Sequence, residues 1–161
     1  MPAPGGDGIL FGDAEYSVYE GTLKVMQIFL SYAESDEALA RKVADGLEQA
    51  GLRVWYDRRE ILPGENWFDK TAKALRESNG MVVLLTPSAL RSTPVRRAIE
   101  FALGEKAYSH RLIPVIVGPP EKLPKKELPW ILEKLQTVNL PERGKQDKGI
   151  RQIAEALLEA A

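Results

Sequence analysis

Short apolar runs alternate along this chain with longer segments in which apolar residues recur every three or four positions. The runs are typical of strands in a parallel sheet that is covered on both faces, and the longer segments are typical of amphipathic helices. We expect strands at residues 25–30, 52–56, 81–85, 112–117 and 137–140, and helices at residues 35–50, 65–77, 93–107 and 149–161. Joined by right-handed crossovers, these elements predict an α/β fold, a flavodoxin-like, doubly wound five-stranded parallel sheet with helices on both faces.

Several side chains are assigned structural roles by their position in this pattern. Ser35 and Asp36 are expected to cap the first helix, and Gly51 is expected to end it. Trp55 in the second strand and Trp130 in a short helix or turn after Pro129 are interpreted as structural. The apolar stripes of the third and last helices are formed by Val95, Ile99, Ala102, Leu103, Ile150, Ile153, Ala154, Leu157 and Leu158.

The first 24 residues differ in composition from the rest, so we predict a leader at residues 1–24 and a folded domain at residues 25–161. The leader starts with a proline- and glycine-rich stretch that we expect to be mobile, and it has no chemistry of its own. Alternatively, its mildly apolar part adds an edge strand or docks on the surface. Neither a secretory signal nor an apolar run of about 18 residues is found, which favours a cytoplasmic protein.

The composition excludes several classes of function. The formal net charge is −1, so neither nucleic acid nor an anionic membrane is expected as the main partner. The chain has no cysteine, which excludes disulfides, zinc–cysteine sites and thiol nucleophiles. His110 is the single histidine, and we expect no metal site.

Motifs of the common nucleotide-binding folds are also missing. No GxGxxG follows the first strand, and no GxxxxGK[ST] occurs anywhere, so dinucleotide-binding and P-loop sites of the usual kind are not predicted. A phosphorylation-receiver domain would need an aspartate at the end of the third strand. That strand ends instead in Leu85, Thr86 and Pro87, which excludes this class.

Five short motifs follow one another at the predicted strands. Each is weak alone, but five in this order and spacing are specific. They are F-L-S-Y-x-x-x-D at residues 29–36, G-x-x-V-W-x-D at 51–57, I-x-P-G-x-x-W at 61–67, S-x-x-x-V-V-L-x-T-P at 78–87 and R-L-I-P-V-x-V at 111–117. In these motifs the chain from about residue 25 to its end resembles a bacterial-type Toll/interleukin-1 receptor (TIR) domain.

The resemblance implies a chemistry. Many TIR domains cleave the nicotinamide–ribose bond of NAD+, giving nicotinamide and ADP-ribose or a cyclic or modified ADP-ribose signal, with NAD+ as the substrate and no prosthetic group. The transition state has oxocarbenium character, and a carboxylate beside the ribose stabilises it. The family takes that carboxylate from a W-V-x-x-E motif on the third helix. Aligned here, Pro94 holds the tryptophan position and Ala98 the glutamate position.

No other acid on this helix is expected to replace the missing carboxylate. Glu100 should face solvent, because two helical residues are separated by about 200°. Glu105 is nearly in phase with Ala98 but about 10 Å further along the helix. The resemblance therefore implies a catalytically dead TIR domain. Either the alanine was introduced to trap an inactive form, which the intact flanking residues favour, or the chain is a natural scaffold without activity, which Pro94 favours.

Candidate binding residues lie at the carboxyl ends of the strands, where doubly wound sheets bind ligands. We expect a crevice walled by residues 31–36, residues 57–67 and the start of the third helix. NAD+ is expected to contact Ser31, Tyr32, Asp57 and Trp67. Trp67 suits either stacking on a ligand ring or core packing. Arg96 and Arg97 suit contact with ligand phosphates, but we favour their interpretation as a solvated face.

The loop before the second helix is the expected interface. The resemblance implies that other TIR domains are partners and that Ile61, Pro63, Gly64 and Glu65 contact them. The function that follows is NAD+ glycohydrolase chemistry in bacterial immune or cell-suicide signalling, including antiviral defence, inactive here because of Ala98. The alternative is a non-catalytic TIR–TIR interaction scaffold.

Overall fold

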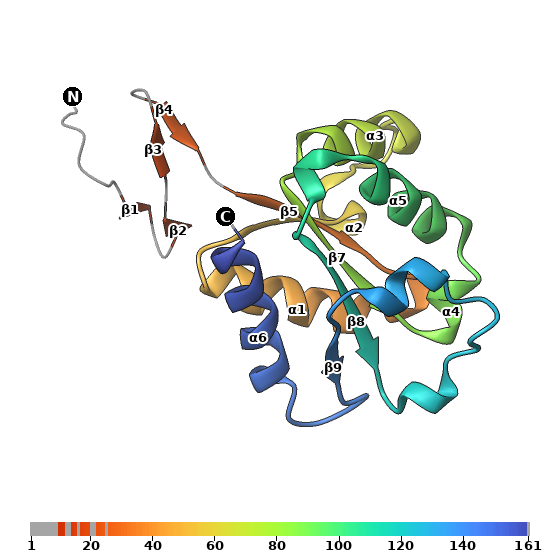
Figure 1. The fold of residues 1–161 in the computed structure, drawn as a ribbon. Helices are drawn as coiled ribbons and strands as arrows, with labels where there is room; N and C mark the ends of the chain where they lie inside the picture. The colour runs from red at the N-terminus through yellow and green to blue at the C-terminus, as the bar shows by residue number, and fades with distance from the viewer. Residues whose placement is uncertain (1–9, 12–13, 16, 20–21, 25, 161) are drawn as a thin grey trace.

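The computed structural model describes residues 10–11, 14–15, 17–19, 22–24 and 26–160. Its central sheet has five parallel strands in the order β6-β5-β7-β8-β9 (Figure 1). The strands are β5 (Gln27–Ser31), β6 (Arg53–Trp55), β7 (Gly80–Leu85), β8 (Leu112–Val117) and β9 (Val138–Leu140). The flavodoxin-like order 2-1-3-4-5 predicted from the apolar runs is therefore confirmed.

Helices cover the two faces of this sheet. Helix α1 (Glu37–Gln49) and helix α6 (Asp147–Glu159) share a core with one face, whereas α3 (Trp67–Glu77) and α5 (Thr93–Gly104) pack on the other (Figure 1). Every residue of β7 is buried, as expected for a central strand with helices above and below. The shorter helical segments are α2 (Asp57–Glu60), α4 (Pro87–Leu90) and the 3-10 turns Glu34–Asp36, Lys106–Tyr108, Pro120–Lys122 and Trp130–Lys134.

The described residues of the N-terminal segment form two small two-stranded sheets. Strand β1 (Leu10–Phe11) pairs with β2 (Ala14–Glu15), and β3 (Ser17–Tyr19) pairs with β4 (Thr22–Lys24), both antiparallel. None of the described leader residues joins the central sheet, so the edge-strand alternative was wrong. The proline- and glycine-rich start lies outside the described residues.

Several boundaries differ from those predicted. Helix α5 ends at Gly104 rather than residue 107, because the chain tightens into the 3-10 turn Lys106–Tyr108. The segment after β6 begins with the short helix α2. The segment after β7 forms α4, which Thr86 caps by accepting a hydrogen bond from the amide of Ala89. Asp36 does not cap α1, because its carboxylate accepts a 2.6 Å hydrogen bond from the Thr86 hydroxyl instead.

Two leucines expected on buried helical stripes and one tryptophan interpreted as structural are exposed. Leu103 and Leu158 follow the first buried residues of their stripes, Val95 and Ile150, by eight positions, which turns them about 80° away around the helix. Trp130 is 70% exposed, while Leu132 in the same 3-10 turn is buried. A 3-10 helix has about three residues per turn, so residues two positions apart point in different directions. Leu132 faces the core, and Trp130 therefore points away from it.

Candidate functional site

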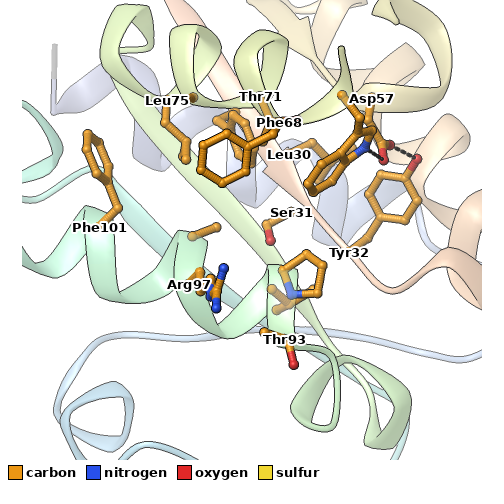
Figure 2. A pocket seen from close by; sticks show the side chains of 16 residues that line it. Leu30, Ser31, Tyr32, Asp57, Phe68, Thr71, Leu75, Thr93, Arg97 and Phe101 are labelled. Atoms are coloured by element: carbon orange, nitrogen blue, oxygen red, sulfur yellow. Dashed lines mark hydrogen bonds between the residues drawn. The ribbon is translucent and has the colours of Figure 1, made fainter. Parts of the chain in front are cut away.

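A cavity of about 300 Å³ opens between α3, α5 and the carboxyl ends of β5 and β6 (Figure 2). Its walls consist mainly of apolar and aromatic side chains with a few polar groups. This composition is typical of small-molecule binding sites. Sixteen residues line it: Phe29, Leu30, Ser31, Tyr32, Asp57, Trp67, Phe68, Thr71, Ala72, Leu75, Thr93, Pro94, Val95, Arg97, Ala98 and Phe101.

Local sequence fixes the two helices that wall this cavity. The Asn66 side chain caps α3 by accepting from the Asp69 amide at 3.0 Å, and the Ser92 hydroxyl caps α5 by accepting from the Val95 amide at 3.3 Å. Pro94 sits in the first turn of α5, where its missing amide hydrogen costs nothing. These caps set where both helices begin, and so which of their side chains face the cavity.

A tyrosine from the 3-10 turn after α5 holds the two helices together. The Tyr108 hydroxyl donates a 2.6 Å hydrogen bond to the Leu75 carbonyl in α3, and its ring meets Phe101 edge-on at 6.1 Å. Burial, aided by the negative charge of Glu105, raises the pKa of Tyr108 to about 12, so the hydroxyl keeps its proton at neutral pH. This contact fixes the width of the cavity at its α3–α5 wall.

A hydrogen-bonded trio forms one end of the cavity. The Tyr32 hydroxyl donates to Asp57 Oδ1 at 2.7 Å, and the Trp67 indole donates to Oδ2 of the same carboxylate at 3.2 Å (Figure 2). Burial, followed by the hydrogen bond to Asp57, raises the pKa of Tyr32 above its usual range, so Tyr32 remains a neutral donor. The trio links the ends of β5 and β6 to the first turn of α3.

Asp57 is the one acid among the residues that line the cavity, and its oxygens are already engaged. Besides Tyr32 and Trp67, the backbone amide of Arg58 donates to Oδ1 at 2.8 Å. A carboxylate that accepts three hydrogen bonds is held in one orientation. Asp57 is therefore arranged to hold the cavity's shape.

Ser31 offers a polar atom to the middle of the cavity. Its side chain is buried, and no hydrogen bond joins its hydroxyl to any residue in the described part of the chain. Figure 2 shows the hydroxyl directed into the cavity. The hydroxyl can therefore form a hydrogen bond with a ligand atom that enters the cavity.

Ala98 lies on α5 and lines the same cavity as Ser31 and the Tyr32–Asp57–Trp67 trio. It is 4% exposed, so its methyl group faces the protein interior rather than solvent. Glu100 is exposed, as predicted, and does not line the cavity. Glu105 lies beyond the last residue of α5, so it is not on the helix at all, contrary to the prediction. Helix α5 therefore brings no carboxylate to this cavity.

Sequence reasoning missed part of the lining. Phe68, Leu75, Arg97 and Phe101 were not among the predicted site residues, and Arg97 was interpreted as a solvated face. Arg97 is exposed as expected, but it also lines the cavity, between Thr93 and Phe101 on α5 (Figure 2). The four-residue spacing of these three was the available signal. Conversely, residues 33–36 were expected as a wall and do not line the cavity.

Trp67 is 43% exposed, so it is not a core residue, and its ring is accessible to a ligand.

The four expected interface residues lie outside the cavity, on the loop between α2 and α3. Pro63 and Gly64 form the predicted turn, closed by the Glu65 amide donating to the Leu62 carbonyl at 3.0 Å. Ile61 precedes this turn. The hydrogen bond from the Leu62 amide, then the contact with Lys70, lowers the pKa of Glu65.

The described residues contain neither a metal-binding cluster nor a membrane-spanning helix. No group of three or more histidines, cysteines or acids among them is arranged to hold a metal ion. Within the same residues, no helix combines the length and apolar character that crossing a bilayer requires.

Comparisons with known proteins agree with the fold and the motifs. The family model for the TIR domain matches residues 28–154. The 2′ cyclic ADP-D-ribose synthase AbTIR of Acinetobacter baumannii is 26% identical over 106 residues, which are 63% of this chain and 39% of AbTIR. The 2′ cyclic ADP-D-ribose synthase BtTIR of Bacteroides thetaiotaomicron is 25% identical over 91 residues, 56% of this chain and 32% of BtTIR. The chain thus spans 39% and 32% of the lengths of these two relatives.

A solved structure has the same fold. A metazoan TIR-STING receptor from C. gigas in complex with 2′,3′-cGAMP superposes with a TM-score of 0.66 at 24% identity, covering 81% of this chain and 38% of the receptor.

Proposed function

Because this chain belongs to the TIR domain family, we propose that its cavity is an NAD+ site from which the catalytic carboxylate has been removed. The observation that carries the proposal is the position of Ala98. Its methyl group lines the cavity where the W-V-x-x-E motif would bring a glutamate, and Ser31 and Trp67 line the same cavity. The names of AbTIR and BtTIR support ADP-ribose chemistry for this branch of the family.

The proposed reaction of a carboxylate-bearing form is cleavage of the bond between ribose C1′ and the nicotinamide nitrogen. Nicotinamide leaves with the bonding electron pair and becomes neutral, and positive charge develops on the ribose ring. A carboxylate at position 98 stabilises that charge. Water then adds to C1′ and releases a proton, giving ADP-ribose, or a ribose hydroxyl adds instead, giving a cyclic product.

The other lining residues have binding roles in this proposal. Trp67 and Phe68 offer aromatic faces to the nicotinamide or adenine ring, and the Ser31 hydroxyl offers a hydrogen bond. Asp57 orients Tyr32 and Trp67 rather than touching the reacting atoms. With Ala98 the site retains binding and loses the charge that lowers the barrier. We place the parent activity in bacterial immune or cell-suicide signalling.

The test is the variant Ala98→Glu, compared with Ala98→Gln and with the unmodified chain. Nicotinamide release from NAD+ would be followed with purified protein at high concentration, so that assembly is not limiting. One preorganised electrostatic group is typically worth about 10²–10³ in rate, so Ala98→Glu should exceed both other proteins by about that factor. Ala98→Gln has the same size without the charge, and equal rates for the two variants would refute the proposal.

The second candidate is a TIR–TIR interaction scaffold. The loop that carries Ile61, Pro63, Gly64 and Glu65 also carries Leu62, which is 63% exposed, and the exposed Phe68 follows in the first turn of α3. Large apolar side chains on an exposed loop favour contact with a partner, here a second copy of the domain. The scaffold and the inactivated enzyme share this surface, and only the Ala98→Glu experiment separates them.

A further inference from the structure

Two charged side chains, Asp57 and Arg97, line the cavity, and they differ in the hydrogen bonds that they form with the rest of the protein. The Asp57 carboxylate accepts from Tyr32, Trp67 and the amide of Arg58. Arg97, by contrast, forms neither an ion pair nor a side-chain hydrogen bond with any residue in the described ranges. The charge left available to a ligand is therefore positive.

The neutral groups define the rest of the ligand. Trp67, Phe68 and Phe101 give the cavity flat apolar walls, which suit a planar aromatic ring. The Ser31 hydroxyl points into the cavity and has no hydrogen-bond partner among the described residues, so it can bond to a polar atom at the edge of that ring (Figure 2). The ligand must be planar, aromatic and polar at one edge.

Alanine at position 98 decides the sign of the charge that the ligand carries. A carboxylate there would offset Arg97 one residue earlier on the same helix and attract a cationic ring. The alanine methyl group does neither, so Arg97 remains the charged lining side chain whose hydrogen-bonding groups are free for a ligand. A guanidinium presents paired N–H groups that match a carboxylate or phosphate.

We propose that this cavity, with alanine at position 98, selects a planar aromatic ligand that carries a negative charge over the positively charged nicotinamide ring of NAD+. This inference rests on the proposed function, because it takes the cavity to be the NAD+ site. In this inference Arg97 determines the charge of the ligand, a role that neither the motifs nor the family relationship had indicated.

The experiment measures binding of three pyridines of nearly equal size that differ in charge: nicotinate, nicotinamide and 1-methylnicotinamide. Titrations of the purified chain would be followed by NMR or calorimetry. Nicotinate should bind tightest and the 1-methylnicotinamide cation weakest. Because Arg97 is exposed to solvent, we expect Arg97→Gln to weaken nicotinate binding by about three- to tenfold and to leave nicotinamide unchanged.

Arg96→Gln is the matched control, because Arg96 is an exposed arginine on the same helix that does not line the cavity. It should leave all three affinities unchanged. Ala98→Glu should reverse the order and favour the cation.

The outcomes separate this inference from the proposed function. Equal binding of nicotinate and nicotinamide, or equal effects of Arg97→Gln and Arg96→Gln, would overturn the inference and leave the NAD+ site in place. No binding of any pyridine, together with an active Ala98→Glu variant, would overturn the inference alone. An inactive Ala98→Glu variant that still binds nicotinate through Arg97 would overturn the proposed function and keep the ligand class.

Discussion

The hydroxyl of Tyr32, which directly follows β5, donates a 2.7 Å hydrogen bond to Asp57, the first residue of α2, two positions after β6. This bond ties two neighbouring strands together at their carboxyl ends, where the cavity opens. Tyr32→Phe removes the hydroxyl and keeps the ring, so we expect it to lower the free energy of unfolding by about 1–2 kcal/mol, as for a hydrogen bond to a charged acceptor. Urea unfolding would measure the change. Trp67→Phe removes a longer bond to the same carboxylate and should cost less, and the reverse order would contradict the role given to Tyr32.

Stability should fall at alkaline pH because of Tyr108. Its pKa is about 12 in the folded chain, mainly through burial, against about 10 for an exposed tyrosine. The folded chain thus holds this proton more tightly than the unfolded chain. The resulting stabilisation is complete below about pH 10 and is lost as the pH rises through about 12. The raised pKa of Tyr32 acts in the same direction.

Tyr108→Phe should lower stability at neutral pH, because the bond to the Leu75 carbonyl is lost, and flatten the alkaline decline. Unfolding free energies between about pH 8 and 12 would measure both effects. An unchanged alkaline slope would show that another group causes the decline.

Thr71 carries a buried side-chain oxygen with no hydrogen-bond partner among the described residues. Burying a hydroxyl without a partner typically costs about 1–3 kcal/mol. We therefore expect Thr71→Val, which keeps the shape, to raise the free energy of unfolding by about 1 kcal/mol. Thermal unfolding would show a higher midpoint. Thr71→Ser keeps the hydroxyl and loses the methyl group, so it should not stabilise, and a gain in both variants would count against this explanation.

Gly46 lets α1 approach α6 closely. A Cβ placed at Gly46 would lie 2.5 Å from Cγ2 of Ile150, whose β-branched side chain has little freedom to move. Gly46→Ala should therefore destabilise the chain by about 1–3 kcal/mol despite the better helix propensity of alanine. Gly104→Ala is the control, because a Cβ at Gly104 meets nothing within 4 Å. Denaturant unfolding should show a loss for Gly46→Ala and no loss for Gly104→Ala.

Assembly through the loop between α2 and α3 can be tested at Leu62. Gly64→Arg has open space but forces a large residue into a φ of +89°, so it strains the turn as well as the surface. Leu62→Gln removes an exposed apolar contact and leaves the turn intact. We expect it to shift the sedimentation of the assembled protein toward the monomer. Leu103→Gln changes another exposed leucine, on α5, and equal effects of the two would place the assembly surface elsewhere.

The sequence by itself determined the sheet, its strand order and the family. The apolar runs mark β7 and β8 most clearly, because strands buried on both faces have few polar side chains to interrupt them. The helical stripes located α1, α5 and α6, because the buried apolar residues of each helix recur on one face. The sequence also aligned Ala98 with the position of the family's glutamate and predicted that Glu100 points away.

Only the tertiary structure decided how the cavity is closed and charged. The exposed fractions of Leu103, Leu158 and Trp130 depend on the width of the surfaces against which their helices pack, and no local pattern encodes that width. The bond from Asp36 to Thr86 spans fifty residues and replaces a local cap. The sequence alone does not distinguish Arg97 from other exposed arginines. Arg97 lines a cavity only because α5 packs beside α3, a helix that is distant in sequence.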